Sequence, residues 1–197
     1  MKVWCENPYD FVLFDEWEHV VSPEDADVLL FSGGSDVTPW MYGQAALSST
    51  AYSVNRDEQN KSTFDMFPDK IKIGICRGSQ FLNVMNGGTL YQDVTNHTSN
   101  HGIFTDDGKY VMVNSTHHQM MYDIGDGELL GWSEGLSDYY KTDNFLYTTP
   151  VLFEPEIVKW PNTKSIGFQY HPEWMNKEAH ARVLFNEYVN KFVEEVQ

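Results

Sequence analysis

The chain has 197 residues, and its 13 Lys or Arg against 29 Asp or Glu give a formal net charge of −16. This length fits a single domain over residues 1–197 whose core needs no disulfide or metal, and the acidity excludes general nucleic-acid binding because phosphate backbones are repelled. No apolar run is long enough to span a membrane and no signal peptide opens the chain, so we expect no membrane contact and a cytoplasmic location.

Apolar runs bounded by turn residues alternate with helix-compatible segments along the first half of the chain. Three runs that lack a polar alternation predict buried strands at Met1–Cys5, Val28–Phe31 and Ile71–Ile75. Helical segments are predicted at Asn55–Phe67 and Gly78–Met85. This order of strands and helices is typical of βαβ units and a parallel sheet.

The second half contains short β-like pieces and then one helix. Strands are predicted at Tyr110–Val113, Glu128–Trp132, Ile157–Trp160 and Ser165–Gln169. An amphipathic helix is predicted from Lys177 to Val196, because apolar residues recur on one face at Ala181, Phe185, Tyr188, Phe192 and Val196.

The two cysteines have different surroundings. Cys5 ends an apolar run and is expected to be a small buried hydrophobic residue. Cys76 stands between Gly74 and Gly78 at a predicted strand-to-helix turn, and this G-x-C-x-G spacing is typical of a nucleophile elbow. The following helix points its N-terminal dipole at the sulfur, which favours the thiolate. A tight turn around an unreactive buried cysteine is the plainer alternative.

A thiolate nucleophile needs a base, and the base needs an orienting group. Of the seven histidines, His171 directly follows a predicted buried strand, and an open α/β sheet places its site residues at strand ends. Pro172 stiffens the turn, and Glu173 is close enough in sequence to hold the imidazole.

A third strand end carries adjacent glycines. Gly33 and Gly34 follow the strand Val28–Phe31 and can turn a backbone N–H toward a reacting carbon. Together with the N–H of Arg77, this gives a two-donor oxyanion hole. A simple loop is the alternative, because two adjacent glycines alone are weak support for a function.

Four stretches resemble the class I glutamine amidotransferase superfamily, and most closely its γ-glutamyl-γ-aminobutyrate hydrolase-like branch. They occur in the family's order between residues 29 and 174: FSGGSDVTP, GICRGSQFLNVMNGGTLYQDV, VNSTHHQ and GFQYHPEW. The resemblance implies a flavodoxin-like, mostly parallel sheet flanked by helices. It also implies a triad of Cys76, His171 and Glu173, and an oxyanion hole from Gly34 and Arg77. The residues expected to hold the substrate are Gly33, Gln80, Ser115, Thr116 and His117.

The sequence departs from the family pattern in two places. Ser35 stands where the family usually has a third glycine, which bears on whether the oxyanion loop is formed in advance or turns over when a partner binds. The connection Asn7–Pro23 is short, which changes the rim that faces the substrate.

A zinc site and two pocket tryptophans are further readings of the sequence. His97, His101, His117 and His118 have a spacing that can bind zinc, but no cysteine or clustered carboxylate completes the set, so no metal is predicted. Trp40 and Trp174 lie close in sequence to the predicted site and can line its pocket.

The resemblance implies hydrolysis of a γ-glutamyl amide, either a γ-glutamyl amine or glutamine, through a thioester on Cys76 and without a cofactor. If ammonia is the leaving group, the chain is instead a glutaminase subunit that feeds a synthase partner, and a homo-oligomer is also compatible. A third reading is an inactive amidotransferase-like binding module. The intact Cys76, His171 and Glu173 argue against that reading.

Overall fold

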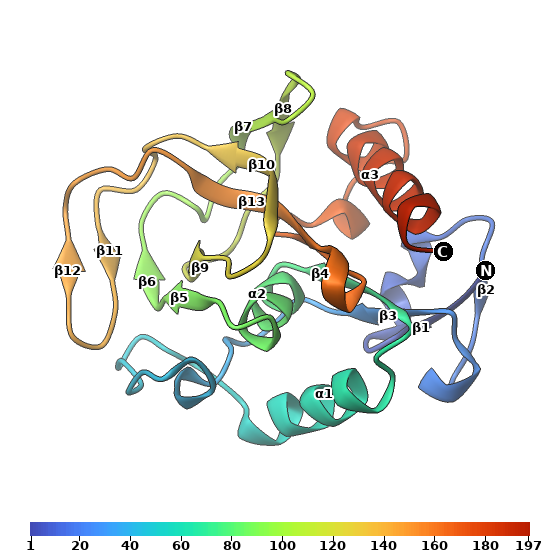
Figure 1. Ribbon diagram of the computed structural model, residues 1–197. Coiled ribbons are helices and arrows are strands. Elements are labelled where there is room, and N and C mark those ends of the chain that lie inside the picture. Colours follow the sequence, from blue (N-terminus) through green and yellow to red (C-terminus); the bar gives the residue numbers. More distant parts are fainter.

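The computed structural model describes all residues from 1 to 197 and is built around a nine-stranded sheet (Figure 1). The strand order is β2-β1-β3-β4-β14-β13-β10-β7-β8. These strands are β2 (Glu18–His19), β1 (Lys2–Cys5), β3 (Val28–Phe31), β4 (Ile71–Ile75), β14 (Ser165–Phe168), β13 (Glu154–Trp160), β10 (Glu128–Ser133), β7 (His101–Thr105) and β8 (Tyr110–Val113).

The central sheet has a parallel half and an antiparallel half. Strands β2, β1, β3, β4 and β14 pair in parallel. From β14 through β13, β10 and β7 to β8, each pair is antiparallel. The predicted α/β fold with a parallel sheet between helices is confirmed, and the short β-like pieces of the second half extend that sheet.

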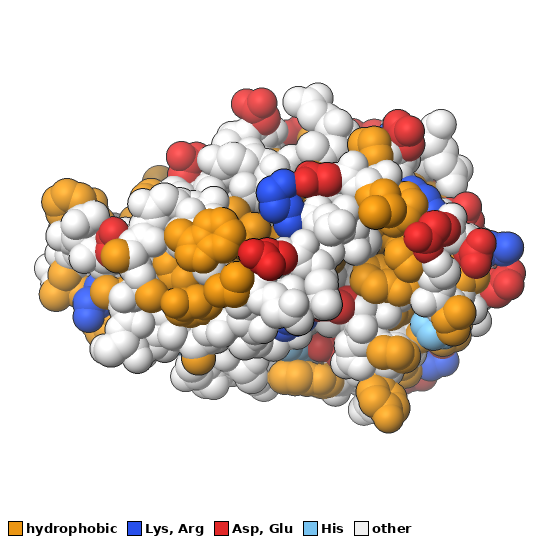
Figure 2. All heavy atoms as spheres, turned by 90° about the horizontal axis from the view of Figure 1, so that it is seen from below, with side chains coloured by type: hydrophobic (Ala, Val, Ile, Leu, Met, Phe, Trp, Pro, Cys, Tyr) orange, Lys and Arg blue, Asp and Glu red, His pale blue; other side chains and the backbone are white.

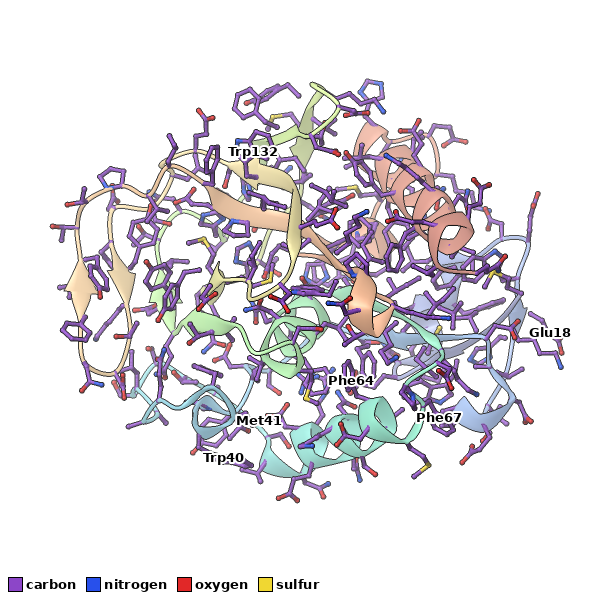
Figure 3. The ribbon with its side chains drawn as sticks, viewed as in Figure 1. Glu18, Trp40, Met41, Phe64, Phe67 and Trp132 are labelled. Carbon is purple, nitrogen blue, oxygen red and sulfur yellow. The ribbon has the colours of Figure 1, made fainter.

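Helices cover both faces of the parallel half, which explains its unbroken apolar strands. Helix α3 (His180–Val196) lies on one face, and α1 (Val54–Met66) and α2 (Arg77–Met85) lie on the other (Figure 1). In β3, Val28 and Leu30 pack in the cluster that contains α3 residues such as Phe185. Leu29 and Phe31 pack on the opposite face with residues of α1 and α2, among them Phe64, which points from α1 toward the sheet (Figure 3).

Two small sheets lie beside the main one. One pairs β5 (Thr89–Tyr91) with β9 (Met120–Asp123), and the other joins β6 (Asp93–Val94), β11 (Tyr140–Lys141) and β12 (Leu146–Tyr147). The view from below shows acidic side chains scattered widely and hydrophobic side chains in several groups, some toward the end where the β11–β12 hairpin lies and others on the opposite side (Figure 2). None of the three α-helices has the length and apolar composition needed to cross a bilayer.

Three neighbouring parallel strands end at one edge of the sheet. Phe31 in β3 pairs with Gly74 in β4, and Ile75 in β4 pairs with Phe168 in β14. The N–H of Cys76, just beyond β4, donates to the carbonyl of Phe168 at 2.7 Å. The segments that follow β3, β4 and β14 therefore meet at the carboxyl edge, where open α/β sheets carry their sites.

Candidate active site

Cys76 occupies a strained turn between β4 and α2. Its backbone has φ +50° and ψ −107°, a left-handed conformation that a non-glycine residue rarely adopts. Both flanking glycines are needed for close approach. A β-carbon at Gly74 would lie 2.5 Å from the carbonyl oxygen of Gly78, and one at Gly78 would lie 2.0 Å from the carbonyl oxygen of Phe31. The G-x-C-x-G spacing therefore has a steric cause.

Both cysteines are buried in the core cluster against α3, with Cys5 3% and Cys76 6% exposed, but their surroundings differ. Burial, with a further contribution from Asp10, raises the pKa of the Cys5 thiol to about 12. Cys76 instead stands at the N-terminus of α2 and lines a cavity.

His171 is held in one orientation at the end of β14. Its Nδ1 lies 2.6 Å from Oε1 of Glu173. The side chain of Asn114 bonds both backbone groups of His171, at 2.9 Å to the N–H and 2.8 Å to the carbonyl. The exposed Trp174 ring stacks on the imidazole at 3.8 Å, nearly parallel to it. A carboxylate, an amide and an indole thus fix the ring.

The electrostatics of His171 favour its charged form. Burial lowers its pKa, but hydrogen bonds with Cys76 and Glu173 outweigh burial and raise the pKa to about 9. The hydroxyl of Thr116 lies 3.1 Å from Nε2 of His171. The carboxylate of Glu173 and the hydroxyl of Thr116 therefore hold the two ring nitrogens of His171.

The loop after β3 is clamped by Arg56 of α1. Its Nη2 donates to the carbonyls of Ser32 and Gly33, each at 3.0 Å. Its Nε and Nη2 also pair with the carboxylate of Glu6 at 2.6 and 2.9 Å, and Glu6 accepts from the N–H of Ser32. Gly34 has φ +137°, and a β-carbon there would lie 2.5 Å from Nη1 of Arg56. This position therefore requires glycine.

The side chain of Arg77 points away from the pocket and joins the turn to the same loop. The Arg77 side chain is 1% exposed and forms an ion pair with Asp57 of α1. Asp57 also accepts from the N–H of Thr38 at 2.8 Å. The Arg77 side chain is thus engaged by Asp57, so the predicted role as oxyanion donor would fall to its backbone N–H. Ser35, the departure from the family pattern, has no positive φ, so this loop does not require a third glycine.

A cavity of about 290 Å³ opens over Cys76 and His171. Its size is at the low end of the range for small-molecule sites. The lining residues are Asn7, Asp10, Gly33, Gly34, Asp36, Cys76, Gln80, Thr116, His117, His118, Gln119, His171, Glu173 and Trp174.

Most of the predicted substrate-binding residues are gathered at this cavity. Gly33, Gln80, Thr116 and His117 line it, and a β-carbon at Gly33 would lie only 2.8 Å from the His171 ring. Ser115 does not line it, because its buried hydroxyl donates to the carbonyl of His97.

Of the two tryptophans near the predicted site, Trp174 lines the cavity and Trp40 does not. Trp40 instead lies on the short helix η3 (Pro39–Tyr42), where it is 57% exposed, at the lower edge of Figure 3.

Sequence reasoning missed several lining residues. Asn7 and Asp10 come from the short connection after β1, and Asp36 and Gln119 lie within the motifs FSGGSDVTP and VNSTHHQ but were not singled out. His118, which the family resemblance places in the pocket wall with His117, lines the cavity, and its Nε2 lies 3.0 Å from Oδ1 of Asp36. That hydrogen bond raises the pKa of His118. No Lys or Arg lines the cavity, so His118 is its candidate cation besides His171.

Residues 17–120 match the Peptidase C26 family, which is just over half of the chain. The chain belongs to the Peptidase C26 family, a class I glutamine amidotransferase-like family. The superfamily resemblance drawn from the four motifs is thereby confirmed, and the hydrolase-like branch is compatible with it.

The relatives carry amidotransferase names. The chain is 34% identical over 125 residues to a glutamine amidotransferase-like protein, the YvdE homolog of Lactococcus lactis subsp. cremoris, covering 51% of this chain and 66% of that protein. It is 29% identical over 195 residues to a candidate glutamine amidotransferase of Schizosaccharomyces pombe, covering 86% of this chain and 71% of the relative. The chain spans 66% and 53% of the two Lactococcus relatives that it matches.

Solved structures share the fold at low identity. A candidate GMP synthase subunit from Thermoplasma acidophilum superposes with a TM-score of 0.62 at 12% identity, covering 99% of this chain and 95% of that one. A glutamine amidotransferase of Thermotoga maritima superposes with a TM-score of 0.56 at 13% identity, covering 99% and 85%. These matches show the fold, whereas the family match supports amide cleavage of the hydrolase type in general.

Proposed function

We propose that this protein hydrolyses γ-glutamyl amide bonds, with Cys76 as nucleophile, His171 as base and acid, and Glu173 as the group that orients His171. The observation that carries the proposal is the strained Cys76 turn, which faces one cavity together with the hydrogen-bonded His171–Glu173 pair. A buried structural cysteine would not require this backbone strain or a charged imidazole beside it.

In the proposed reaction, the Cys76 thiolate attacks the side-chain amide carbon of the substrate. The carbonyl oxygen becomes an oxyanion, stabilised by the N–H groups of Gly34 and Arg77. The His171 imidazolium gives its proton to the leaving amine as the C–N bond breaks, which leaves a thioester. Water then gives a proton to His171 and attacks the thioester, so that glutamate leaves and the thiolate is restored.

The cavity wall supports recognition of an amino acid. His118, with its pKa raised by Asp36, is a suitable partner for a substrate carboxylate. Gln80 is 2% exposed, and its Nε2 donates to the carbonyl of Gln119 at 2.9 Å, which fixes this wall. The small volume favours glutamine or a γ-glutamyl compound with a small leaving amine.

The clamp on the Gly33 carbonyl favours a preformed oxyanion hole. The carbonyl and the following N–H of a trans peptide point in opposite directions. Because Arg56 holds the Gly33 carbonyl at 3.0 Å, the Gly34 N–H faces away from Arg56. We therefore favour a self-sufficient hydrolase over a glutaminase that needs a partner to turn this peptide.

A glutaminase subunit that supplies ammonia to a synthase is the second candidate. The superposition on a candidate GMP synthase subunit favours it. So do the exposed apolar side chains around the β11–β12 hairpin, which a partner would cover. The most exposed of these are Phe145, Leu146, Leu152 and Phe153.

Steady-state glutamate release from glutamine and from a panel of γ-glutamyl amines tests the proposal, with Cys76→Ser as the matched inactive control. The hydrolase reading predicts a kcat of roughly 1 s⁻¹ or faster for at least one substrate with the chain alone. A chain that is nearly inert alone and gains about 10²-fold with a synthase supports the second candidate. A folded chain that is inert in every combination overturns both and favours a binding module.

A further inference from the structure

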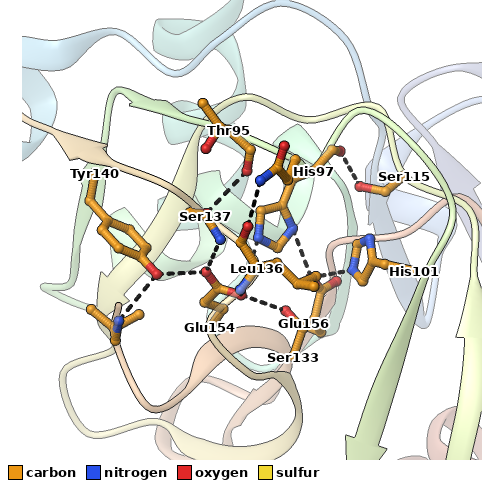
Figure 4. A network of polar contacts seen from close by, with 12 residues as sticks. Thr95, His97, His101, Ser115, Ser133, Leu136, Ser137, Tyr140, Glu154 and Glu156 are labelled. Carbon is orange, nitrogen blue, oxygen red and sulfur yellow. Dashed lines mark hydrogen bonds and ion pairs between the residues drawn. The ribbon is translucent and has the colours of Figure 1, made fainter. Parts of the chain in front are cut away.

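A second group of buried titratable side chains adjoins the cavity, and one of its members, His117, lines the cavity. Figure 4 shows most of this group. His97 comes from the segment before β7, His101 from β7 itself and His117 from the loop after β8. Glu154 and Glu156 come from β13. All five are at most 7% exposed, and the proposed reaction uses neither the two glutamates nor His97 and His101.

Each of the three imidazoles faces oxygen acceptors with both ring nitrogens. In His101, Nδ1 lies 3.2 Å from the carbonyl of Ser99, and Nε2 lies 2.9 Å from Oε1 of Glu156. In His117, Nδ1 lies 2.8 Å from the carbonyl of Gln119, and Nε2 lies 3.8 Å from the same Glu156 oxygen.

His97 repeats this pattern between the two glutamates. Its Nδ1 is 3.4 Å from Oε1 of Glu156, and its Nε2 is 3.4 Å from Oε2 of Glu154. A neutral imidazole has one N–H and one lone pair, so each neutral ring here turns a lone pair toward an oxygen. Both nitrogens of His97, Nε2 of His117 and Oε2 of Glu156 have no hydrogen-bond partner. Such a concentration of unpaired buried polar atoms requires an explanation.

A cation at the centre removes the conflict. As neutral rings, His97 and His117 can donate their outer N–H groups to Glu154 and Gln119, which leaves two lone pairs directed at Oε1 of Glu156. This is the outer-shell arrangement of metal-bound histidines, whose second nitrogen donates to a carbonyl or carboxylate. A divalent ion also balances the charges of the two buried carboxylates, which are costly to bury otherwise.

We propose that His97, His117 and Glu156 bind one divalent metal ion of the zinc class, with the His101 ring hydrogen-bonded to the Glu156 ligand oxygen beside it. One ligand atom from each of His97, His117 and Glu156 lies within 4.8 Å of the other two. Ligand atoms about 2.0–2.1 Å from a tetrahedral zinc lie roughly 3.4 Å apart. The separations of 3.4 and 3.8 Å from Glu156 to His97 and His117 are close to that value. Imidazole and carboxylate ligands suit zinc.

The burial of the group gives the metal a structural role. All three ligands are protein side chains shielded from solvent, which suits a structural ion that holds segments together. The ion ties the segment before β7 and strand β13 to the loop that carries His117. Through the His117 contact with Gln119, whose carbonyl also accepts from Gln80, it stiffens one wall of the cavity.

Folding supplies the carboxylate that the histidine spacing lacks. The sequence alone offered no acidic ligand near the histidines, whereas the sheet brings Glu156 beside them from far along the chain. His118, the fourth histidine of that spacing, instead pairs with Asp36 and is excluded from the group.

The test uses the full chain with any histidine tag removed and measures metal content by mass spectrometry. We expect about one zinc-class ion per chain in the wild type. The metal content of the variants His97→Gln and Glu156→Gln should be at least about fivefold lower, since each variant lacks one ligand. Two controls should keep it: Cys76→Ser, which alters the other candidate thiolate site, and His180→Gln, which removes an exposed histidine outside the group.

A second measurement holds even if the ligand variants do not fold. Wild-type chain stripped with a chelator should lose several degrees of Tm and regain them with ZnCl2, because a ligand that binds only the folded state stabilises it. The proposal is overturned by a wild type with less than about one ion per ten chains and no response of Tm to ZnCl2. In that case a proton on His97, and not a metal ion, supplies the positive charge between Glu154 and Glu156. Metal lost in Cys76→Ser also overturns it and assigns the ion to the cavity.

Discussion

Replacing Arg56 by Met tests the preformed oxyanion hole. The substitution keeps an unbranched stem and removes the guanidinium, so the carbonyls of Ser32 and Gly33 lose donors at 3.0 Å. The carboxylate of Glu6 loses its bidentate partner as well. Nothing else then fixes the Gly33–Gly34 peptide, and glycine turns easily at both positions.

The expected magnitude follows from these contacts. A hydrogen bond to a charged group contributes about 1.5–3 kcal/mol, and only the bond from Arg56 to the Gly33 carbonyl holds the Gly33–Gly34 peptide itself. Each 1.4 kcal/mol is about tenfold in population, so the loss of this bond shifts the orientation of the peptide by roughly 10- to 100-fold toward the turned state. One lost oxyanion donor costs on the order of 10²–10³ in rate. We therefore expect kcat to fall by about 10²-fold with little change in KM.

Glutamate release gives kcat and KM, with Lys61→Met as the matched control. Lys61 is on the same helix and loses an exposed ion pair with Asp65, which is expected to change activity little. Circular dichroism and Tm establish that both variants are folded. A folded Arg56→Met protein with wild-type kcat would refute the clamp.

Four further predictions concern the remaining site residues. A glutamine-like diazo-ketone should label Cys76 and spare Cys5, whose pKa is about 12, and peptide mapping that finds equal labelling contradicts this. His171→Ala should abolish turnover, whereas Glu173→Gln should only impair it, with a difference of roughly tenfold or more in kcat; equal losses argue against separate roles. Gly34→Ala should lower kcat and Tm together, since its φ of +137° and its contact with an arginine leave no room, and unchanged values contradict the loop geometry. The His171 pKa is raised from 6.5 to about 9, so its contribution to stability is complete below pH 6.5 and is lost as the pH rises through 9. Unfolding free energies from pH 6 to 10 should therefore decline more in the wild type than in His171→Gln, and parallel curves would be the contrary result.

The strands and the turn at Cys76 were predictable because their causes are local. Val28–Phe31 and Ile71–Ile75 are strands with the predicted bounds, since both faces of each are covered. The glycines around Cys76 are required because a β-carbon there would clash with atoms of the same turn or of the adjacent strand. His171 could be found because it follows a recognisable strand.

The supports of the site were not predictable because they join distant segments. Helix α1 has a weak apolar pattern, since its buried face includes Asp57 and Asn60 beside Phe64. Asp57 is buried to pair with Arg77, and Asn60 donates to Glu6. A reading based on hydrophobic period treats such residues as solvent-facing.

The buried histidine–glutamate group could not be predicted for the same reason. Glu156 lies outside the predicted strand Ile157–Trp160, but β13 begins at Glu154 and leaves Glu156 0% exposed. Its partners His97, His101 and His117 are supplied by two segments that only the sheet brings together.

The central claim is that Cys76 carries the substrate's glutamyl group as a thioester, and rapid acid quench of the working enzyme tests it most directly. Wild-type chain mixed with its best substrate, quenched within one turnover and digested should yield one glutamyl adduct, on the peptide that contains Cys76. Cys76→Ser should yield none. A preparation that turns over substrate yet shows no adduct on Cys76, or shows it on Cys5, would contradict the account.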